Sequence, residues 1–187
     1  MSVRVLCKTK WVSLMAMKTD MTGDNEYIYS HENRCDGKIV SILPYRYKTR
    51  MGIISPHEKY GIEYLLRKEV TPPWGKPPKQ FISSITGGVE NGDTIGTAVH
   101  EIAEEAGYEV DRKDLKFLDI SYGSKSSDTV YYLYTVDLSG KEKTLKAKGD
   151  GSILETMAEC FWSDTIENAV DPLVYVSYYK IQKMLKK

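Results

Sequence analysis

Three glutamates, Glu101, Glu104 and Glu105, are spaced three and four residues apart within a stretch that has a helical pattern. Residues at these spacings are neighbours on a helix surface, so the three carboxylates share one side of the helix. Carboxylates this close repel one another by roughly 0.2–0.5 kcal/mol per pair unless a cation lies among them. Carboxylate oxygens are the ligands that hard divalent cations such as Mg²⁺ prefer. The pattern predicts a divalent-metal site, and the alternative is a solvated acidic helix face.

The same stretch has an apolar side that can pack against a sheet. At about 100° per residue, one side of the helix gathers Ile95, Val99, Ile102, Ala103 and Ala106. Gly87 and Gly88 precede the helix, and Gly107 follows it, where a left-handed glycine commonly ends a helix. If the apolar side is buried, the acidic side faces outward into a cleft.

The stretch from Gly87 to Tyr108 resembles the signature of the Nudix hydrolases. That signature is written Gly-x5-Glu-x7-Arg-Glu-U-x-Glu-Glu-x-Gly-U, where U is a bulky aliphatic residue. The residues that match it in register are Glu101, Ile102, Glu104, Glu105 and Gly107. Two features depart from it. His100 stands at the arginine position, and the first glycine of the pattern would fall on Thr86, so the loop before the helix is shortened.

The resemblance implies a metal-dependent hydrolase of phosphoanhydride bonds. It implies that Glu101, Glu104 and Glu105 hold Mg²⁺, with Mn²⁺ as the alternative, and that a main-chain carbonyl at Gly87 or Gly88 completes the site. Bound Mg²⁺ neutralises phosphate charge and lowers the pKa of the attacking water. Glu104 is also a candidate catalytic residue.

His100 is the second candidate catalytic residue. In the family, the arginine at this position holds the first glutamate of the pattern, here Glu101, by a charged fork. Histidine is only partly charged near neutral pH and cannot form that fork. We therefore expect His100→Arg to raise the hydrolytic rate, most visibly above neutral pH.

A further carboxylate is expected from the segment that follows the last long strand. Residues 139–154 are polar and longer than the usual connection of about 4–6 residues, which predicts a mobile lid. Glu155 stands at its end and is the third candidate catalytic residue, as general base or extra metal ligand. Asp150 and Glu159 are its alternatives.

Arg46, Arg67 and Trp74 are the candidate substrate-binding residues, because they could contact phosphate or stack on a base. Ordinary packing on a strand or in a loop is the alternative for each. More than eighty residues precede the helix, a layout similar to the ADP-ribose pyrophosphatase branch of the family. That similarity implies cleavage of ADP-ribose to AMP and ribose 5-phosphate. The alternatives are dinucleoside polyphosphates, NADH or capped RNA as substrates, or a nucleotide sensor with little turnover.

The composition narrows the class of protein. Lys and Arg total 26, as do Asp and Glu, so no net charge attracts nucleic acid or an anionic membrane. Three widely spaced cysteines favour a reducing compartment over a disulfide framework. No apolar run approaches the ~20 residues of a membrane span. We expect a soluble, cytoplasmic protein.

The strand and helix patterns predict an α/β (α+β) protein, with an α/β/α sandwich around a mixed sheet, which is also the fold that the Nudix resemblance implies. Expected strands cover 3–17, 26–30, 38–47, 51–54, 63–70, 81–85, 115–122, 129–137 and 155–162. Helices are expected after the glycine pair and over 164–170 and 172–185. We expect residues 1–36 to form an antiparallel strand region, a candidate dimerisation element, and residues 37–187 to form the hydrolase domain.

Overall fold

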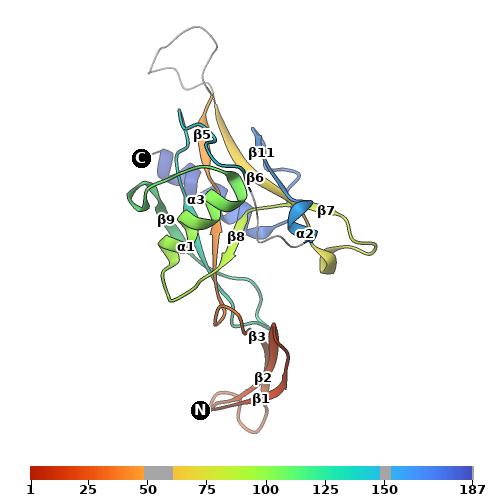
Figure 1. Cartoon of the computed structure of the whole chain (residues 1–187). Helices are drawn as coiled ribbons and strands as arrows, with labels where there is room; N and C mark the ends of the chain where they lie inside the picture. The colour runs from red at the N-terminus through yellow and green to blue at the C-terminus, as the bar shows by residue number, and fades with distance from the viewer. Residues whose placement is uncertain (49–60, 148–152, 187) are drawn as a thin grey trace.

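The computed structural model describes residues 1–48, 61–147 and 153–186, in which strands form three sheets (Figure 1). The expected strand at 51–54 and the candidate Asp150 lie outside these residues. No helix in the described ranges is both long and apolar enough to cross a membrane.

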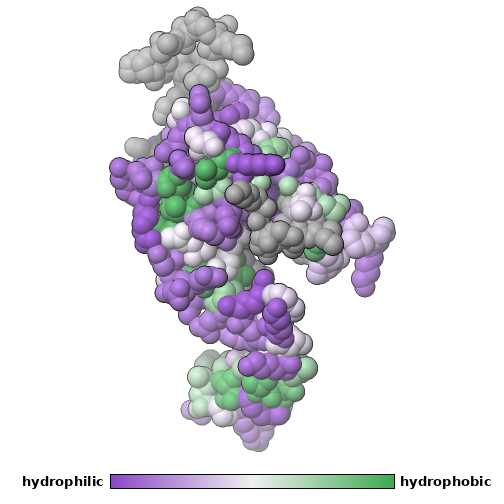
Figure 2. All heavy atoms as spheres, viewed as in Figure 1, coloured by the Kyte–Doolittle hydropathy of each residue, from purple (hydrophilic) through white to green (hydrophobic). Residues whose placement is uncertain are grey.

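The first sheet projects from the rest of the molecule at the N-terminal end (Figure 1). Its strands β1 (Ser2–Lys8), β2 (Val12–Lys18) and β3 (Tyr27–Glu32) are antiparallel and pair in chain order. Backbone hydrogen bonds link β3 to the segment before β10, since Ser30 N donates to Ser126 O at 2.9 Å and Asp128 N donates to Ser30 O at 3.2 Å. Figure 2 shows apolar side chains gathered on this sheet. The expected antiparallel N-terminal strands are present.

The second sheet is mixed, as expected. Its order is β8 (Ile85–Gly88), β4 (Lys38–Ile42), β10 (Val130–Thr135), β9 (Lys116–Tyr122). Strands β4 and β10 are parallel, and the other two pairs are antiparallel.

The third sheet is antiparallel. It contains β11 (Glu159–Ser163), β6 (Ile62–Val70) and β5 (Tyr45–Tyr47), and β7 (Gln80–Ser83) pairs with β6. Pro44 separates β4 from β5, so the strand expected over 38–47 divides between two sheets. This fits the inability of proline to donate to a strand ladder.

Two helices cover the sheets. Helix α1 (Thr94–Glu101) continues as a π-helical turn, η2 (Ile102–Ala106), and ends at Gly107, whose φ is +77°. Helix α3 (Pro172–Leu185) begins after Asp171, whose side chain accepts a hydrogen bond from Leu173 N at 2.9 Å. Short helical turns are η1 (Pro72–Trp74), η3 (Arg112–Asp114) and α2 (Ile153–Thr156).

The apolar side predicted for the box helix is buried. Ala98, Ile102 and Ala106 pack in one cluster with Val40 and Ile85 of the mixed sheet. A second cluster lies under α3, where Val174 and Ile181 pack with residues of β5 and β6. Burial of one side of α1 and η2 leaves the glutamates of the other side facing outward.

Two further expected elements differ from the structure. The expected strand at 155–162 begins as the helical turn α2, and β11 starts only at Glu159. The expected helix at 164–170 is absent from the described chain, because side chains compete for its backbone groups. Thr165 N donates to Ser163 Oγ at 3.3 Å, and Glu167 N donates to Thr165 Oγ1 at 3.2 Å.

Candidate active site

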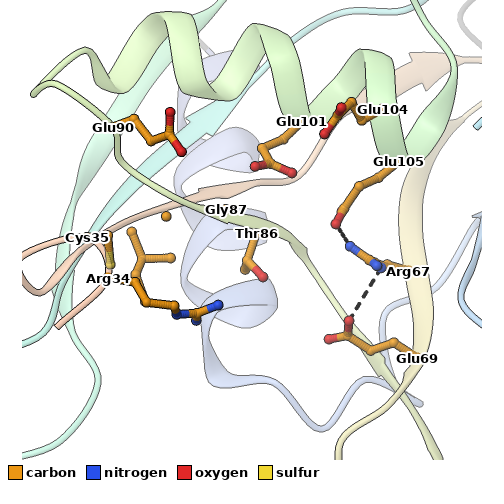
Figure 3. Close-up of a pocket in the computed structure, with 12 residues that line it drawn as sticks. Arg34, Cys35, Arg67, Glu69, Thr86, Gly87, Glu90, Glu101, Glu104 and Glu105 are labelled. Carbon is orange, nitrogen blue, oxygen red and sulfur yellow. Dashed lines mark ion pairs between the residues drawn. The ribbon is translucent and has the colours of Figure 1, made fainter. Parts of the chain in front are cut away.

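A cavity of about 430 Å³ lies beside the acidic side of the box helix (Figure 3). Strands β6 and β8 and the turn between β3 and β4 complete its walls. Its lining residues are Arg34, Cys35, Ile39, Arg67, Glu69, Thr86, Gly87, Gly88, Glu90, Glu101, Glu104 and Glu105.

The Glu101 side chain lies directly against the backbone of Gly87. A Cβ atom on Gly87 would overlap the Glu101 carboxylate, so the close approach requires a residue without a side chain. Gly87 pairs with Val40 inside the mixed sheet, which fixes its position. The last residue of α1 and the strand before it thus place a carboxylate next to main-chain atoms of the glycine pair.

Glu105 is held in a buried ion pair with Arg67 of β6. The Arg67 residue is 5% exposed, and its Nε lies 3.3 Å from Glu69 Oε2. Ser83 Oγ donates to the other Glu69 oxygen at 2.8 Å. Glu105 Oε2 is buried and has no hydrogen-bond partner among the residues that the structure describes. Burial of such an oxygen without a partner lowers the stability of the fold, unless a bound group such as a cation contacts it.

Glu104 lies toward solvent and pairs with His100. His100 Nδ1 is 3.4 Å from Glu104 Oε2, and the His100 side chain is 66% exposed. His100 therefore forms an ion pair with Glu104, whereas its position in the family pattern implies a pair with Glu101. A neighbouring surface hollow is lined by His100, Glu101 and Glu104 together.

The donor set suits a hard divalent cation. Five glutamates and two arginines line the cavity, so carboxylates outnumber cationic side chains. The buried Glu105 oxygen, which no described residue hydrogen-bonds, also favours a cation. In residues 1–48, 61–147 and 153–186, no three His, Cys, Asp or Glu side chains converge closely enough to hold a metal as they stand. The side-chain chemistry fits the metal, while the Arg67 pair keeps Glu105 turned towards β6 (Figure 3).

Two groups near the site have shifted pKa values. Asp93 caps α1 by accepting a hydrogen bond from Gly96 N at 3.0 Å. It also accepts hydrogen bonds from both terminal nitrogens of Arg112. Chiefly through the Arg112 hydrogen bonds, the pKa of Asp93 falls from 3.8 to about 2. Burial raises the pKa of the Cys35 thiol above its usual range.

The other predicted site residues lie elsewhere. Arg46 bonds to Glu63 at 2.8 Å and stacks over the Trp162 ring at 4.1 Å. Trp74 packs edge-on against Phe81 beside a separate apolar cavity of about 590 Å³. Neither residue lines the carboxylate cavity, and their substrate contacts stay predictions.

The segment expected to form the lid is only partly described. Thr144 and Leu145 N both donate to Gly107 O at 3.1 Å, which ties this part of the segment to the end of the box helix. Residues 148–152 lie outside the described residues, and the backbone of Glu155 is in α2. The catalytic role of Glu155 stays a prediction.

Sequence reasoning missed several residues of the cavity. Glu69 is two positions from Arg67 on one strand, and this alternation would have placed both on the same face. Glu90 lies two residues after the glycine pair. Arg34 and Cys35 belong to a turn distant in sequence from the box, and only the fold brings them to the cavity.

Two of the comparisons with known proteins find matches. A model of the NUDIX domain matches residues 51–167. Among solved structures, an ADP compounds hydrolase matches with a TM-score of 0.68 and 12% sequence identity, over 100% of this chain and 92% of that one. This likeness concerns the fold. Comparison with curated proteins gives no match. Since the domain model covers more than half of the sequence and includes the glutamate helix, the chain belongs to the Nudix family.

Proposed function

We propose that this Nudix hydrolase cleaves a nucleoside diphosphate joined to another group, and that ADP-ribose, yielding AMP and ribose 5-phosphate, is its substrate. The observation that carries the proposal is the acidic cavity, where the Glu101 carboxylate lies against the Gly87 backbone and a buried Glu105 oxygen has no hydrogen-bond partner in the described part of the chain. A solved structure with a similar fold is an ADP compounds hydrolase, which supports an adenosine diphosphate derivative as the substrate.

The cavity residues divide the chemistry among them. Glu101, Glu104 and Glu105 would hold Mg²⁺ or Mn²⁺, with the Gly87 carbonyl as a neighbouring ligand. When bound, the cation supplies charge neutralisation on phosphate and a water of lowered pKa. Arg67 fixes the orientation of Glu105 through their ion pair.

Proton transfer from the attacking water needs a carboxylate that solvent can reach. Glu104 meets this requirement, because its side chain is partly exposed and its partner His100 is on the surface. It can accept the proton as general base and pass it to bulk water. Glu155 is the alternative base.

The test is a substrate panel containing ADP-ribose, NADH, a diadenosine polyphosphate and capped RNA. Each is incubated with Mg²⁺, with Mn²⁺ or with excess chelator, and the products are identified by chromatography. We expect AMP and ribose 5-phosphate from ADP-ribose only when a divalent cation is present. Rapid turnover in excess chelator, or phosphate release from a simple phosphomonoester instead, would contradict the proposal.

A nucleotide sensor is the second candidate function. The observation that favours it is His100, which cannot form the charged fork of an arginine and pairs with exposed Glu104 instead. A sensor would bind ADP-ribose tightly in a calorimeter and show negligible turnover in the panel. The intact set of three glutamates favours the hydrolase.

We also propose that the N-terminal sheet packs against a second copy of the chain. The strand register places Val3, Met17 and Tyr27 in one row across the sheet, and a second row holds Val5, Met15 and Tyr29. Side chains two apart on a strand share a face, so both rows lie on the same side. Val3, Val5 and Tyr27 are all exposed. An exposed apolar face of this kind on a projecting sheet is typical of an interaction surface.

A further inference from the structure

The cavity contains a second arginine that the proposed chemistry does not use. Arg34 lies in the turn between β3 and β4, and its guanidinium extends into the cavity below Glu101 and beside Thr86 (Figure 3). It therefore approaches from the side opposite the box helix, which carries the glutamates. The cavity has an acidic wall and, across from it, a cationic group.

Arg34 and Arg67 differ in how much of their charge is available to a ligand. Arg67 is buried between Glu69 and Glu105, which together compensate its charge. The Arg34 side chain is 60% exposed, and its Nε donates to Glu32 Oε1 at 2.9 Å. Its terminal nitrogens make no hydrogen bond to any residue in the described ranges. They can therefore offer parallel N–H groups to an oxyanion.

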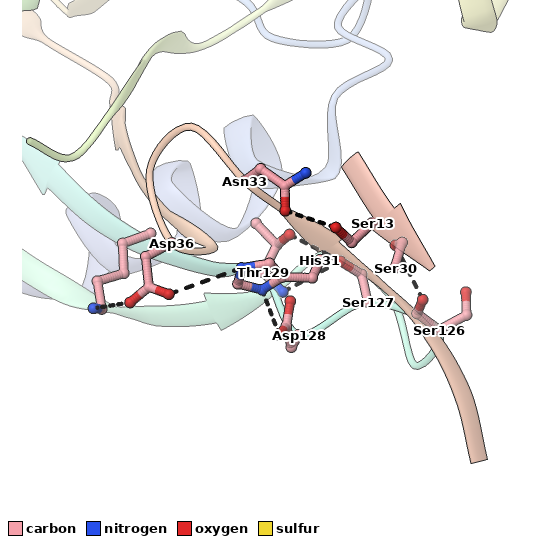
Figure 4. A network of polar contacts seen from close by, with 10 residues as sticks. Ser13, Ser30, His31, Asn33, Asp36, Ser126, Ser127, Asp128 and Thr129 are labelled. Carbon is pink, nitrogen blue, oxygen red and sulfur yellow. Dashed lines mark hydrogen bonds and ion pairs between the residues drawn. The ribbon is translucent and has the colours of Figure 1, made fainter. Parts of the chain in front are cut away.

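The N-terminal sheet holds the turn that carries Arg34. Asn33 makes three hydrogen bonds to the region around the β1–β2 turn. Its backbone N donates to Trp11 O at 2.8 Å, and its Nδ2 donates to Thr9 O at 2.9 Å. Its Oδ1 accepts from Ser13 Oγ at 2.8 Å (Figure 4). These contacts fix the backbone next to Arg34.

Trp11 also supports the Arg34 side chain. The guanidinium carbon lies 4.9 Å from the centre of the Trp11 ring, within the range of a cation–π interaction. Stacking of this kind restricts the rotamers of a long side chain that would otherwise sample solvent. The N-terminal sheet thus contributes to the position of a cavity residue.

We propose that Arg34 binds the diphosphate group of the substrate and that Trp11 positions Arg34 for this contact. The proposal rests on the proposed function and specifies how the same site holds its substrate. A diphosphate is repelled by the carboxylates of the cavity, so it needs cationic partners on both sides. A metal on the glutamate wall provides one, and Arg34 provides the other.

The first test compares Arg34→Gln with Arg4→Gln. Arg4 is a matched control, because it lies on the N-terminal sheet that supports the Arg34 turn, is 61% exposed and pairs with Glu26, but does not line the cavity. For Arg34→Gln we expect the KM for ADP-ribose to rise about tenfold or more, as for loss of a charge-assisted hydrogen bond. The kcat and the affinity for Mn²⁺, measured by electron paramagnetic resonance, should stay unchanged. Arg4→Gln should behave as wild type.

The second test separates positioning from binding. Trp11→Leu should raise the KM less than Arg34→Gln does, and it should add nothing in the Arg34→Gln background, because the two residues act through one contact. Equal effects of Trp11→Leu in both backgrounds would contradict the positioning role. Circular dichroism and gel filtration on every variant identify any loss of fold or change of assembly.

The outcomes distinguish this proposal from the proposed function. If wild type hydrolyses ADP-ribose and Arg34→Gln keeps the wild-type KM, the Arg34 proposal fails while the function stands. If wild type shows no turnover, calorimetry compares the affinity of wild type and of Arg34→Gln for ADP-ribose. Binding that weakens about tenfold or more in Arg34→Gln supports the contact. Equal binding, or no binding by wild type, overturns it.

Discussion

The Glu101 carboxylate occupies the space that a side chain on Gly87 would need. This relationship joins the end of α1 to the end of β8, and it makes a glycine necessary for geometric reasons rather than for backbone flexibility. It also places the carboxylate beside the Gly87 main chain, where a metal ligand is expected from the family pattern.

Gly87→Ala is therefore expected to displace Glu101 and to lower both the affinity for Mn²⁺ and the hydrolytic rate by about tenfold or more. Gly88→Ala is the matched control, because its Cβ would lie 3.1 Å from Cys35 Cβ and would need only a small adjustment. Metal titration and initial rates on both variants provide the measurement. A fully active Gly87→Ala variant would show that Glu101 can work from another position.

The local patterns predicted much of the fold. The spacing of apolar residues in the box, with Gly107 after them, predicted both the helix and its buried side. The alternation of apolar and polar residues, together with prolines that mark strand ends, predicted most strands. The prediction of a helix at 164–170 was wrong, because the Ser163 and Thr165 side chains form hydrogen bonds with nearby backbone groups. The spacing of apolar residues does not reveal such bonds.

The candidate site could be predicted only where its residues are close in sequence. Glu101, Glu104 and Glu105 all line the cavity, and they come from one helix. The partner of Glu105 could not be predicted, because Arg67 reaches it across a contact between β6 and η2. Arg34 depends on how the N-terminal sheet meets the domain, which is a property of the tertiary structure alone.

Glu101→Gln and Glu105→Gln are both expected to remove most of the activity, but they should differ in stability. The sequence alone suggests that neither change disturbs the fold, because neither residue is on the apolar side. The structure changes this expectation for Glu105, since its neutralisation leaves buried Arg67 with Glu69 as its anionic partner. We expect Glu105→Gln to lower the free energy of unfolding by roughly 1–3 kcal/mol. Glu101→Gln should change it by less than about 1 kcal/mol.

Urea unfolding without metal measures this difference, and the substrate assay measures the loss of activity. Equal stability of the two variants would mean that the Arg67–Glu105 pair makes no net contribution to the free energy of unfolding. Wild-type rates in both variants would mean that the glutamates form a solvated helix face.

His100→Arg is expected to raise the hydrolytic rate at alkaline pH, through Glu104. Arginine stays charged at every working pH, whereas histidine does not. The pair is exposed, and such pairs contribute only about 0.3–0.5 kcal/mol, so the gain should stay below about threefold. A pH–rate series on wild type, His100→Arg and the uncharged His100→Gln checks this. Identical profiles for all three would remove His100 from the catalytic residues.

Asp93 is expected to make the box helix sensitive to acid. Its pKa is lower in the folded protein, about 2 compared with 3.8, so its contribution to stability is fully present above pH 3.8. The contribution is lost as the pH falls towards about 2. Asp93→Asn keeps a capping oxygen but removes the charge. Urea unfolding between about pH 5 and pH 2 should show a steeper loss in wild type, and parallel losses would contradict the Arg112 pairing.

The apolar face of the N-terminal sheet predicts the state of assembly. Val5→Lys places a charge at the β1 end of one of the two apolar rows, where contact with a second copy would bury it without a partner. We expect wild type to elute as a dimer and Val5→Lys as a monomer, measured by light scattering during gel filtration. Arg4→Lys is the control, because Arg4 is on the neighbouring register position and points to the other face of β1. A wild-type monomer, or a Val5→Lys dimer of undiminished stability, would show that this face does not bind a second copy.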